Sequence, residues 1–308
     1  MRTSIVGYPR IGANRELKFW TEAYFRGDIA ADELLANAKA LRLAQWQKQQ
    51  GSGIDHIPSG DFSFYDGVLD TAVLLGAVPQ RYRDLNLGEL DTYFAMAKGY
   101  QSEAGDVKAL SMRKWFNTNY HYIVPELEDN TTLSLQGSKL FDEVAEAAAQ
   151  GIATKPVITG PLTFLKLAKR TGEKELASYV EQAIAAYAEV LARLAELGVE
   201  WVQIDEPILV TDLNEADIAL FEHIYTTLLS KKGSLKVLLQ TYFGDIRDCY
   251  QTVVALPFDG IGLDFVEGRE SFALVERYGF PANKTLFAGL VNGKNIWRNN
   301  YEHTLQAL

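Results

Sequence analysis

Short β-rich runs that alternate with helical segments constrain the fold of this chain more than any other feature. The runs cover residues 3–8, 55–60, 109–117, 155–160, 200–206, 235–242, 260–265 and 285–291. Segments with helical periodicity cover residues 14–26, 31–49, 65–75, 90–98, 139–150, 162–169, 174–197, 215–229, 246–255, 271–278 and 296–308. Strands that alternate with helices pair in parallel. Eight such units in 308 residues predict an α/β fold of the (β/α)8 barrel type, which needs about 250 residues and tolerates insertions.

The pattern predicts a single domain over residues 1–308, with extra helices in its early connections. Two helical segments precede the second strand, and the second of them ends at the break Gly51-Ser52-Gly53. An open doubly wound sheet is the other architecture to consider, but it would be favoured by a glycine-rich phosphate fingerprint, which the sequence lacks. We expect the strand at 285–291 to close the barrel and the last amphipathic helix to follow it.

Charge and composition exclude several classes of partner. The net charge is −10 and the sequence pI is about 5.0, which argues against binding to nucleic acid or to an anionic membrane. No run approaches the roughly 18 apolar residues of a membrane span, and the N-terminus lacks the apolar core of a secretion signal. The single cysteine, Cys249, fits a reducing compartment. We therefore expect a cytoplasmic protein in which any anion site is local.

A basic pair follows the first predicted strand and points to such a site. Gly7, Pro9 and Gly12 punctuate a turn, after which Asn14 is a candidate N-cap for the next helix. Arg15 and Lys18 are three residues apart, so they share one helix face near the positive end of the helix dipole. The alternative is a solvated charged stripe on an amphipathic helix.

Three stretches carry a resemblance to a known family. They are Gly7-Tyr8-Pro9-Arg10-Ile11-Gly12 with the following Arg15-Glu16-Leu17-Lys18, then Asp55-His56-Ile57-Pro58-Ser59-Gly60-Asp61-Phe62-Ser63, and then Lys114-Trp115-Phe116-Asn117-Thr118-Asn119-Tyr120-His121-Tyr122. Together they resemble the N-terminal half of cobalamin-independent methionine synthases. That resemblance implies a methyltransferase of methionine biosynthesis, with its catalytic C-terminal barrel absent from this chain.

The resemblance also implies a substrate site. It assigns Arg15, Glu16, Leu17, Lys18 and Lys114 to the anionic tail of 5-methyltetrahydrofolate oligoglutamate. Several carboxylates in a row require several cations, and Arg and Lys supply forked hydrogen bonds and point charge respectively. In the predicted barrel the ends of strands one and three would lie only about 10 Å apart. The three cations would then face one mouth, as binding groups of such barrels do.

Other polar residues follow predicted strands and are candidates to line the same mouth. Ser59 and Asp61 follow the second strand, and Asp61 could equally cap a helix. Asn117 and Asn119 follow the third strand, where they could also stiffen a loop.

Trp201-Val202-Gln203-Ile204-Asp205-Glu206-Pro207 is a strand that ends in two acids. Neighbours on a strand point in opposite directions, so one acid is expected to face the mouth and the other the helices. The Asp-Glu-Pro segment also resembles the Asn-Glu-Pro of barrel glycosidases, which makes a retaining glycoside hydrolase the alternative function. Glu206 would be its acid, and Asp264 or Glu267 would supply the second carboxylate about 5–10 Å away.

The family's zinc chemistry is expected to lie outside this chain. The resemblance implies a zinc ion in the C-terminal barrel and no cobalamin. The only imidazole and thiol groups here are those of His56, His121, His223, His303 and Cys249, and none is paired at a metal-binding spacing. We therefore expect no metal, no catalytic residue and no methyl transfer in the chain alone, and a role in binding the folate tail and docking the C-terminal barrel. A non-catalytic interaction module is the remaining alternative.

Overall fold

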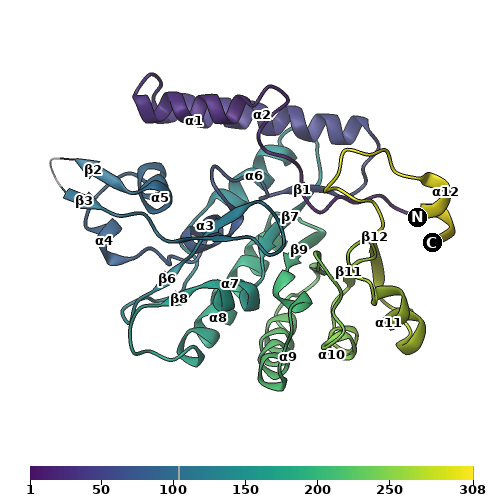
Figure 1. The fold of residues 1–308 in the computed structure, drawn as a ribbon. Coiled ribbons are helices and arrows are strands. Elements are labelled where there is room, and N and C mark those ends of the chain that lie inside the picture. Colours follow the sequence, from purple (N-terminus) through teal and green to yellow (C-terminus); the bar gives the residue numbers. More distant parts are fainter. Residues whose placement is uncertain (103–104, 308) are drawn as a thin grey trace.

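The centre of the molecule is a curled sheet of six parallel strands (Figure 1). The computed structural model describes residues 1–102 and 105–307. The strands lie in the order β1 (Ile57–Ser59), β7 (Thr154–Thr159), β9 (Trp201–Asp205), β10 (Lys236–Gln240), β11 (Gly260–Asp264) and β12 (Thr285–Gly289). Every pairing between neighbours is parallel. The α/β fold class is therefore confirmed.

The register of the sheet brings the carboxyl ends of its strands together. Asp205 pairs with Thr159 on one side and with Gln240 on the other, and Gln240 pairs with Gly262. Polar groups that end these strands consequently meet at one edge of the sheet, where parallel α/β folds build their binding sites. The interior positions of β9, β10 and β11 are buried, as expected for strands covered on both faces.

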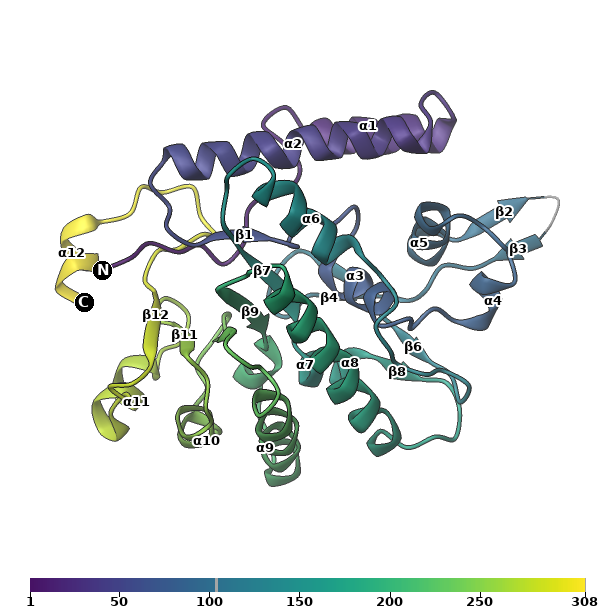
Figure 2. The ribbon, with the colours of Figure 1, turned by 180° about the vertical axis from the view of Figure 1, so that it is seen from behind.

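Helices cover the convex face of the curl, as both views show (Figures 1 and 2). The helices from β1 onward are α3 (Gly67–Leu74), α4 (Gln80–Arg83), α5 (Glu89–Lys98), α6 (Lys139–Ala148), α7 (Pro161–Leu167), α8 (Ala177–Glu196), α9 (Glu215–Leu229), α10 (Tyr250–Ala255), α11 (Ser271–Tyr278) and α12 (Tyr301–Ala307), with a 3-10 turn η1 (Pro207–Val210). The largest buried cluster joins the inner faces of α6 to α11 to the sheet. Apolar burial therefore fixes the outer layer against the strands.

The first two helices form a separate pair. The helices α1 (Glu16–Arg26) and α2 (Ala31–Gly51) lie side by side in both views. Leu17 of α1 packs with Ala38 of α2 and with Phe62, which follows β1. This small cluster ties the helix pair to the carboxyl end of the first sheet strand.

Two of the eight predicted strands do not join the sheet. Residues 3–8 contribute only a parallel bridge from Ser4 to His56, and Val6 is 41% exposed, so they are not the buried strand that was expected. Residues 109–117 contain β4 (Met112–Lys114), which pairs in antiparallel with β5 (His121–Ile123) to form a hairpin. Every residue of β4 is exposed, and two adjacent cationic side chains, Arg113 and Lys114, disfavour the place of a central parallel strand, which is buried on both faces.

The predicted closed ring of eight strands is not formed, because two of the eight predicted strands lie outside the sheet. In the part of the chain that the structure describes, hydrogen-bonded pairing runs from β1 to β12 without a ladder that links β12 back to β1. The sheet is a curled half-barrel.

The long connection between β1 and β7 holds most of the irregular structure. It contains the antiparallel pair β2 (Tyr100–Ser102) and β3 (Gly105–Val107), the β4–β5 hairpin, and β6 (Glu126–Leu127), which pairs with β8 (Lys169–Arg170). This region projects to one side of the sheet (Figures 1 and 2). Among the described residues, no helix is both long and apolar enough to cross a membrane.

Candidate functional site

A cleft of about 1600 Å³ lies at the carboxyl edge of the sheet. Segments far apart in the sequence border it: residues 7–11 before α1, the tip and the β5 side of the β4–β5 hairpin, the end of β9, the loops that follow β1 and β10, and one face each of α2, α3 and α6. Aromatic side chains on its wall include Trp115, Tyr242 and Phe243. A cleft of mixed aromatic and charged lining at this edge is the usual form of a small-molecule site.

Asp205 stands at the floor of the cleft. Its carboxylate accepts hydrogen bonds from the Gln203 side chain at 2.7 Å and from the Tyr242 hydroxyl at 3.0 Å. Burial raises the pKa of Asp205 to about 7, although these two donors and the nearby Lys155 favour its charged form. The floor therefore holds a carboxyl group that titrates near neutral pH.

Lys155 lies beneath Asp205, in the middle of β7, and its side chain is 2% exposed. Its ammonium group donates to the Gln203 side chain and, at 3.3 Å, to the backbone carbonyl of Ile5. The amide of Gln203 donates in turn to the carbonyl of Val6 at 3.0 Å. Burial lowers the pKa of Lys155 to about 8, against the pull of Asp205 and Asp61. These side-chain bonds from the sheet hold residues 5–6 in place. They take the role that backbone hydrogen bonds would have in a paired strand.

Asp61 lines the cleft from the loop after β1. Its carboxylate accepts a hydrogen bond from the Tyr8 backbone N–H at 2.7 Å, and burial raises its pKa. Asp61 thus holds the turn of residues 7–11 in place, rather than capping a helix. The preceding Gly60 has φ +77°, and a Cβ there would lie 2.5 Å from Leu140 and 2.9 Å from the Val157 carbonyl, so this turn requires glycine.

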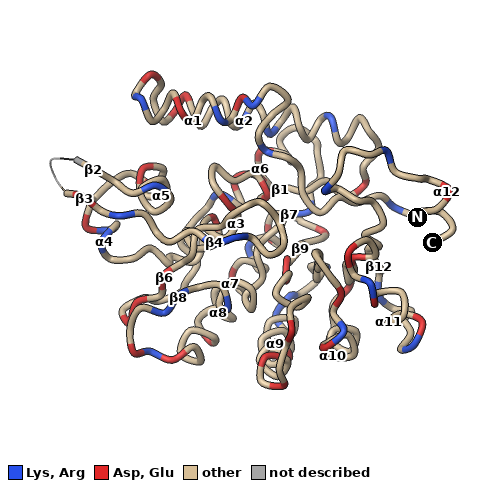
Figure 3. The backbone as a smooth tube through the Cα atoms, in the orientation of Figure 1, with Lys and Arg blue, Asp and Glu red and all other residues tan. Residues whose placement is uncertain are grey.

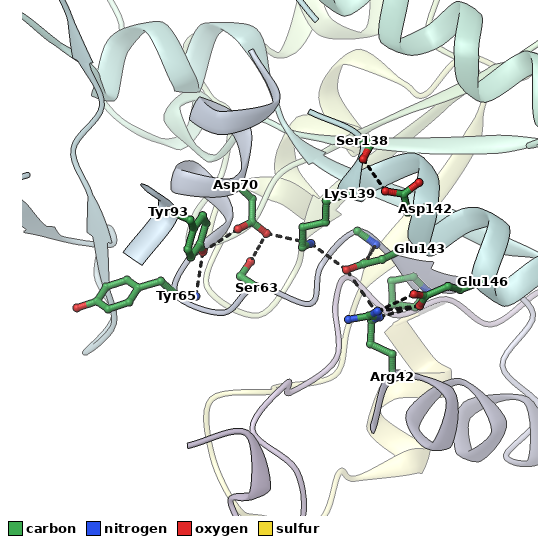
Figure 4. A network of polar contacts seen from close by, with 12 residues as sticks. Arg42, Ser63, Tyr65, Asp70, Tyr93, Ser138, Lys139, Asp142, Glu143 and Glu146 are labelled. Carbon is green, nitrogen blue, oxygen red and sulfur yellow. Dashed lines mark hydrogen bonds and ion pairs between the residues drawn. The ribbon is translucent and has the colours of Figure 1, made fainter. Parts of the chain in front are cut away.

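A buried ionic network forms the wall beside Asp61 (Figure 4). Glu143 of α6 is 2% exposed and accepts from the Gly60 backbone N–H at 2.9 Å. Its carboxylate lies 3.0 Å from the Lys139 ammonium and 3.8 Å from the Arg42 guanidinium. Arg42 also makes a two-pronged ion pair with Glu146 at 2.8–3.0 Å.

The same network continues to the other side of Lys139. The ammonium group lies 3.1 Å from the carboxylate of Asp70, which accepts from Ser63 and from the Tyr93 hydroxyl, each at 2.8 Å (Figure 4). Tyr93 also accepts from the Tyr65 backbone N–H at 2.9 Å. Helices α2, α3, α5 and α6 are thereby joined through charges as well as through apolar contacts.

Asp66 adds a second carboxyl group with a raised pKa to this wall. It caps α3 by accepting from the backbone N–H groups of Val68 and Leu69, and it accepts from Ile123 of β5 at 2.9 Å. Burial raises its pKa to about 7.

Glu206 faces away from the cleft, into the helix layer. It is fully buried and accepts from Leu162 N–H, Thr163 N–H, the Thr163 hydroxyl and the Tyr225 hydroxyl at 2.5–2.9 Å. Burial raises its pKa to about 7. Its acceptor positions are taken by the N-terminus of α7 and by Tyr225 of α9, so the glycoside hydrolase alternative, in which Glu206 donates a proton to a substrate in the mouth, is not favoured.

The second carboxylates of that alternative also have structural partners. Asp264 accepts from the backbone N–H groups of Phe243, Val266 and Glu267 at 2.8–2.9 Å. Glu267 accepts from the Asn117 side chain and from the Lys294 ammonium, each at 2.8 Å. Both acids organise the loops that follow β10 and β11.

The remaining candidates after the predicted strands are divided between core and surface. Ser59 is fully buried, donates to the Thr154 hydroxyl at 2.8 Å and does not line the cleft, so its placement at the mouth is wrong. Asn117 lies at the hairpin tip in the contact with Glu267 described above. Asn119 is exposed at the same tip.

The segment Arg15-Glu16-Leu17-Lys18 starts α1, four residues after Ile11 of the cleft wall. Arg15, not Asn14, is the N-cap, and its φ of 63° is left-handed. The Glu16 carboxylate accepts from the Asn14 backbone N–H at 2.9 Å, and hydrogen bonds from its own backbone N–H and then from Asn14 lower the pKa of Glu16. Leu17 is buried, and Lys18 is partly exposed with its ammonium 3.6 Å from Glu22. The structure thus presents both cations to solvent on one helix start.

Lys114 is exposed on β4. The geometric premise that placed it at the end of a barrel strand is wrong, because β4 belongs to the hairpin. A different relation joins the two cationic segments: Ile11, four residues before Arg15, and Trp115, next to Lys114, line the same cleft. Acidic and basic side chains are interspersed elsewhere along the chain (Figure 3).

The imidazole and thiol groups do not converge on a metal. His56 packs against Trp201 and Phe287, His223 binds Glu181 at 2.7 Å, and Cys249 is buried with a pKa raised to about 12 by desolvation. Within residues 1–102 and 105–307, no three His, Cys, Asp or Glu side chains are grouped to hold a metal ion. These residues do not fit the zinc site that the family resemblance implies.

Sequence reasoning missed Lys155, Tyr242 and the network around Lys139. For Lys155 a signal was present, since a lysine inside the apolar run Thr154-Lys155-Pro156-Val157-Ile158 must find buried partners. Lys139 and Glu143 are four apart on one helix face, which suggests only a surface pair. Their burial depends on segments distant in sequence.

Comparison with known proteins identifies the family. A family model described as the N-terminal domain of cobalamin-independent synthase matches residues 2–308. The chain is 55% identical over 308 residues to the 5-methyltetrahydropteroyltriglutamate–homocysteine methyltransferase of Streptococcus thermophilus and 54% identical to that of Lactococcus lactis subsp. lactis. In both comparisons all of this chain is matched, and it spans 41% of the relative's length.

Solved structures share the fold at low sequence identity. The B12-independent methionine synthase of Shewanella sp. W3-18-1 superposes with a TM-score of 0.65 at 16% identity, over 91% of this chain and 77% of the other. A Listeria monocytogenes protein assigned as a vitamin-B12-independent methionine synthase gives a TM-score of 0.68 at 14% identity, over 99% and 83%. Both likenesses concern the fold alone.

Proposed function

The chain belongs to the cobalamin-independent methionine synthase family, as its N-terminal domain, and we propose that it holds the oligoglutamate tail of the folate substrate. The names of its relatives describe transfer of a methyl group from 5-methyltetrahydropteroyltriglutamate to homocysteine. In this proposal the full-length enzyme makes methionine in the cytoplasm. The present chain contributes substrate binding and a surface that docks the C-terminal barrel.

One observation carries the proposal: the loop that leads to Arg15 and the hairpin that carries Lys114 border one cleft. Both side chains are exposed, and Lys18 lies one turn along from Arg15. A triglutamate tail carries several carboxylates, which three separated cations match better than a single one. On a chain of net charge −10, such a group of cations is the local attraction that an anionic tail needs.

Glu16 and Leu17 support this arrangement without contacting an anion. The Glu16 carboxylate holds the Asn14 backbone and so fixes the left-handed turn at Arg15. Leu17 anchors the start of α1 in the small cluster with Ala38 and Phe62. Both residues therefore set the direction in which the cations project.

In this proposal methyl transfer itself is carried out by the part of the relatives' length that this chain does not span. Asp205 and Asp61, the carboxylates at the cleft floor, are held by donors within this chain. The scattered His and Cys residues offer no zinc ligand set to activate a homocysteine thiol. We expect no turnover above background when the isolated chain receives zinc, homocysteine and methylated folate, and measurable turnover would refute this division of labour.

The binding role is tested by comparing mono- and triglutamyl 5-methyltetrahydrofolate. We expect the isolated chain to bind the triglutamyl form more tightly at low salt, with the difference shrinking as ionic strength rises. Lys18→Ala and Lys114→Ala should each weaken triglutamyl binding by about fivefold, equivalent to about 1 kcal/mol, and leave monoglutamyl binding nearly unchanged. Lys231→Ala removes an equal charge from an exposed position after α9 and serves as the control. Equal affinities for the two folates, unchanged by Lys18→Ala, would favour a pure interaction module instead.

A further inference from the structure

We propose that Asn117, Glu267 and Lys294 form a latch that positions the hairpin bearing Lys114 and thereby sets the preference for a long glutamate tail. The inference rests on the proposed function and assigns positioning roles to three residues that need not touch the tail.

The latch is a closed ring of three hydrogen bonds. The Asn117 amide donates to the Glu267 carboxylate at 2.8 Å, and its carbonyl oxygen accepts from the Lys294 ammonium at 2.8 Å. Lys294 also donates to Glu267 at 2.8 Å. These bonds lower the pKa of Glu267, the ion pair with Lys294 contributing most. One residue from the hairpin tip is thus tied to the β11 loop and to the segment after β12.

Aromatic contacts beside the ring point to a held conformation. Phe116 and Phe243 both have left-handed backbones, with φ of 46° and 76°. Left-handed conformations are costly for bulky residues and persist where surrounding structure enforces them. The two rings lie 5.8 Å apart, and the Lys294 ammonium lies 4.7 Å from the centroid of Phe243. The backbone N–H of Phe243 is fixed by Asp264 at 2.9 Å.

The hairpin transmits the position of its tip to Lys114. Lys114 pairs with His121 in the last rung of the hairpin, and the Trp115 N–H donates to the Tyr120 carbonyl at 2.8 Å. Trp115 packs against Phe116 at 4.9 Å and against Tyr122 at 5.7 Å. Only two residues lie between Lys114 and Asn117, so release of the tip changes where the Lys114 ammonium lies relative to the start of α1.

An exchange of chemical groups within the ring tests the latch. Asn117→Asp places two carboxylates against one ammonium, and we expect it to reduce the ratio of triglutamyl to monoglutamyl affinity by about fivefold, because like charges repel at this distance. It should also speed amide hydrogen exchange at residues 115–120. Adding Glu267→Gln restores one carboxylate, one amide and one ammonium in swapped positions, and should return the ratio to within about twofold of the original.

The control is Glu276→Gln, which removes one charge from an exposed position on α11 and should leave the ratio and the exchange unchanged. A wild-type preference for triglutamyl folate that persists in Asn117→Asp, while tip exchange increases, overturns the latch alone. Failure of the double variant to recover the ratio also overturns it. Absence of any wild-type preference overturns the proposed function and this inference with it.

Discussion

The part of the chain from β7 to β12 and the part between β1 and β7 differ in how far charges add to apolar packing. In the first, each strand pairs with the next strand of the sheet along the chain, and the helices bury apolar faces against it. In the second, short hairpins and helices share a smaller apolar cluster and are also joined by the ionic network of Figure 4. Apolar packing is non-directional, whereas a buried charge requires its partners in place. The regular part therefore supplies the scaffold, and the irregular part supplies the walls of the cleft.

Among the substitutions proposed, removal of Glu143 from the irregular part should lower the free energy of unfolding most. Glu143→Ala leaves the Gly60 N–H, Lys139 and Arg42 without their shared acceptor. We expect the free energy of unfolding to fall by about 3–5 kcal/mol, because the Gly60 N–H loses its acceptor, buried Arg42 keeps only Glu146 and half-buried Lys139 keeps only Asp70. Urea denaturation measures the change. The matched variant Glu222→Ala on the exposed face of α9 should cost less than about 0.5 kcal/mol, and an equally small cost for Glu143→Ala would show that the network is not what joins these helices.

A cavity should weaken the regular part somewhat less. Leu239 is fully buried in β10, and Leu239→Ala should lower the free energy of unfolding by about 3 kcal/mol through lost transfer energy and a residual void. This loss should be insensitive to salt and pH, unlike that of Glu143→Ala. Urea denaturation at low and high ionic strength makes the comparison, and a strong salt dependence of the Leu239→Ala effect would contradict the assignment of forces.

The sequence predicted the regular part well because its signal is local. Helical periodicity located α9 at 215–229 and α11 at 271–278, which are the observed bounds. Short apolar runs between breaks located the sheet strands β7, β9, β10, β11 and β12, but not the two-residue β8. Alternation along a strand further predicted that Asp205 and Glu206 point in opposite directions, but their assignment to mouth and helix layer depends on the α7 N-terminus and on Tyr225, which are separate in sequence.

The irregular part was predicted poorly because its partners are distant. Residues 109–117 have the length of a strand, yet their exposed charges pair with β5 as a hairpin. The network joins Arg42, Asp70, Tyr93 and Glu143 from four helices, and no local spacing relates them. The family resemblance, by contrast, pointed to Arg15 and Lys114 through motifs rather than geometry, and their binding role stays a prediction.

Asp205, which belongs to the regular part but opens into the cleft, should make stability depend on pH. Burial raises the pKa of Asp205 in the folded state to about 7, from its usual 3.8, so the folded state binds the proton more tightly. The stability that protonated Asp205 contributes to the folded state is fully present below pH 4 and is lost as the pH rises through 7. The free energy of unfolding of Asp205→Asn, relative to that of the wild type, should therefore rise by about 2 kcal/mol between pH 4 and pH 8. This value is smaller than the full pKa shift would give, because solvent at the cleft screens the carboxylate. Urea denaturation across this range tests the sign, and a constant difference between the two proteins would refute it.

Removal of one tyrosine hydroxyl from each part compares the two parts through the smallest expected effect. Tyr93 donates to Asp70 within the network, and Tyr187 donates to the Thr159 carbonyl beneath the sheet. Each Tyr→Phe change should cost about 1 kcal/mol. In a double-mutant cycle with Glu143→Gln, Tyr93→Phe should show a coupling energy of about 0.5–1 kcal/mol, because Asp70 and Lys139 connect the two sites, whereas Tyr187→Phe should simply add. Equal coupling for both tyrosines would mean that the network does not act as a unit, and that the irregular part is held in the same way as the rest of the molecule.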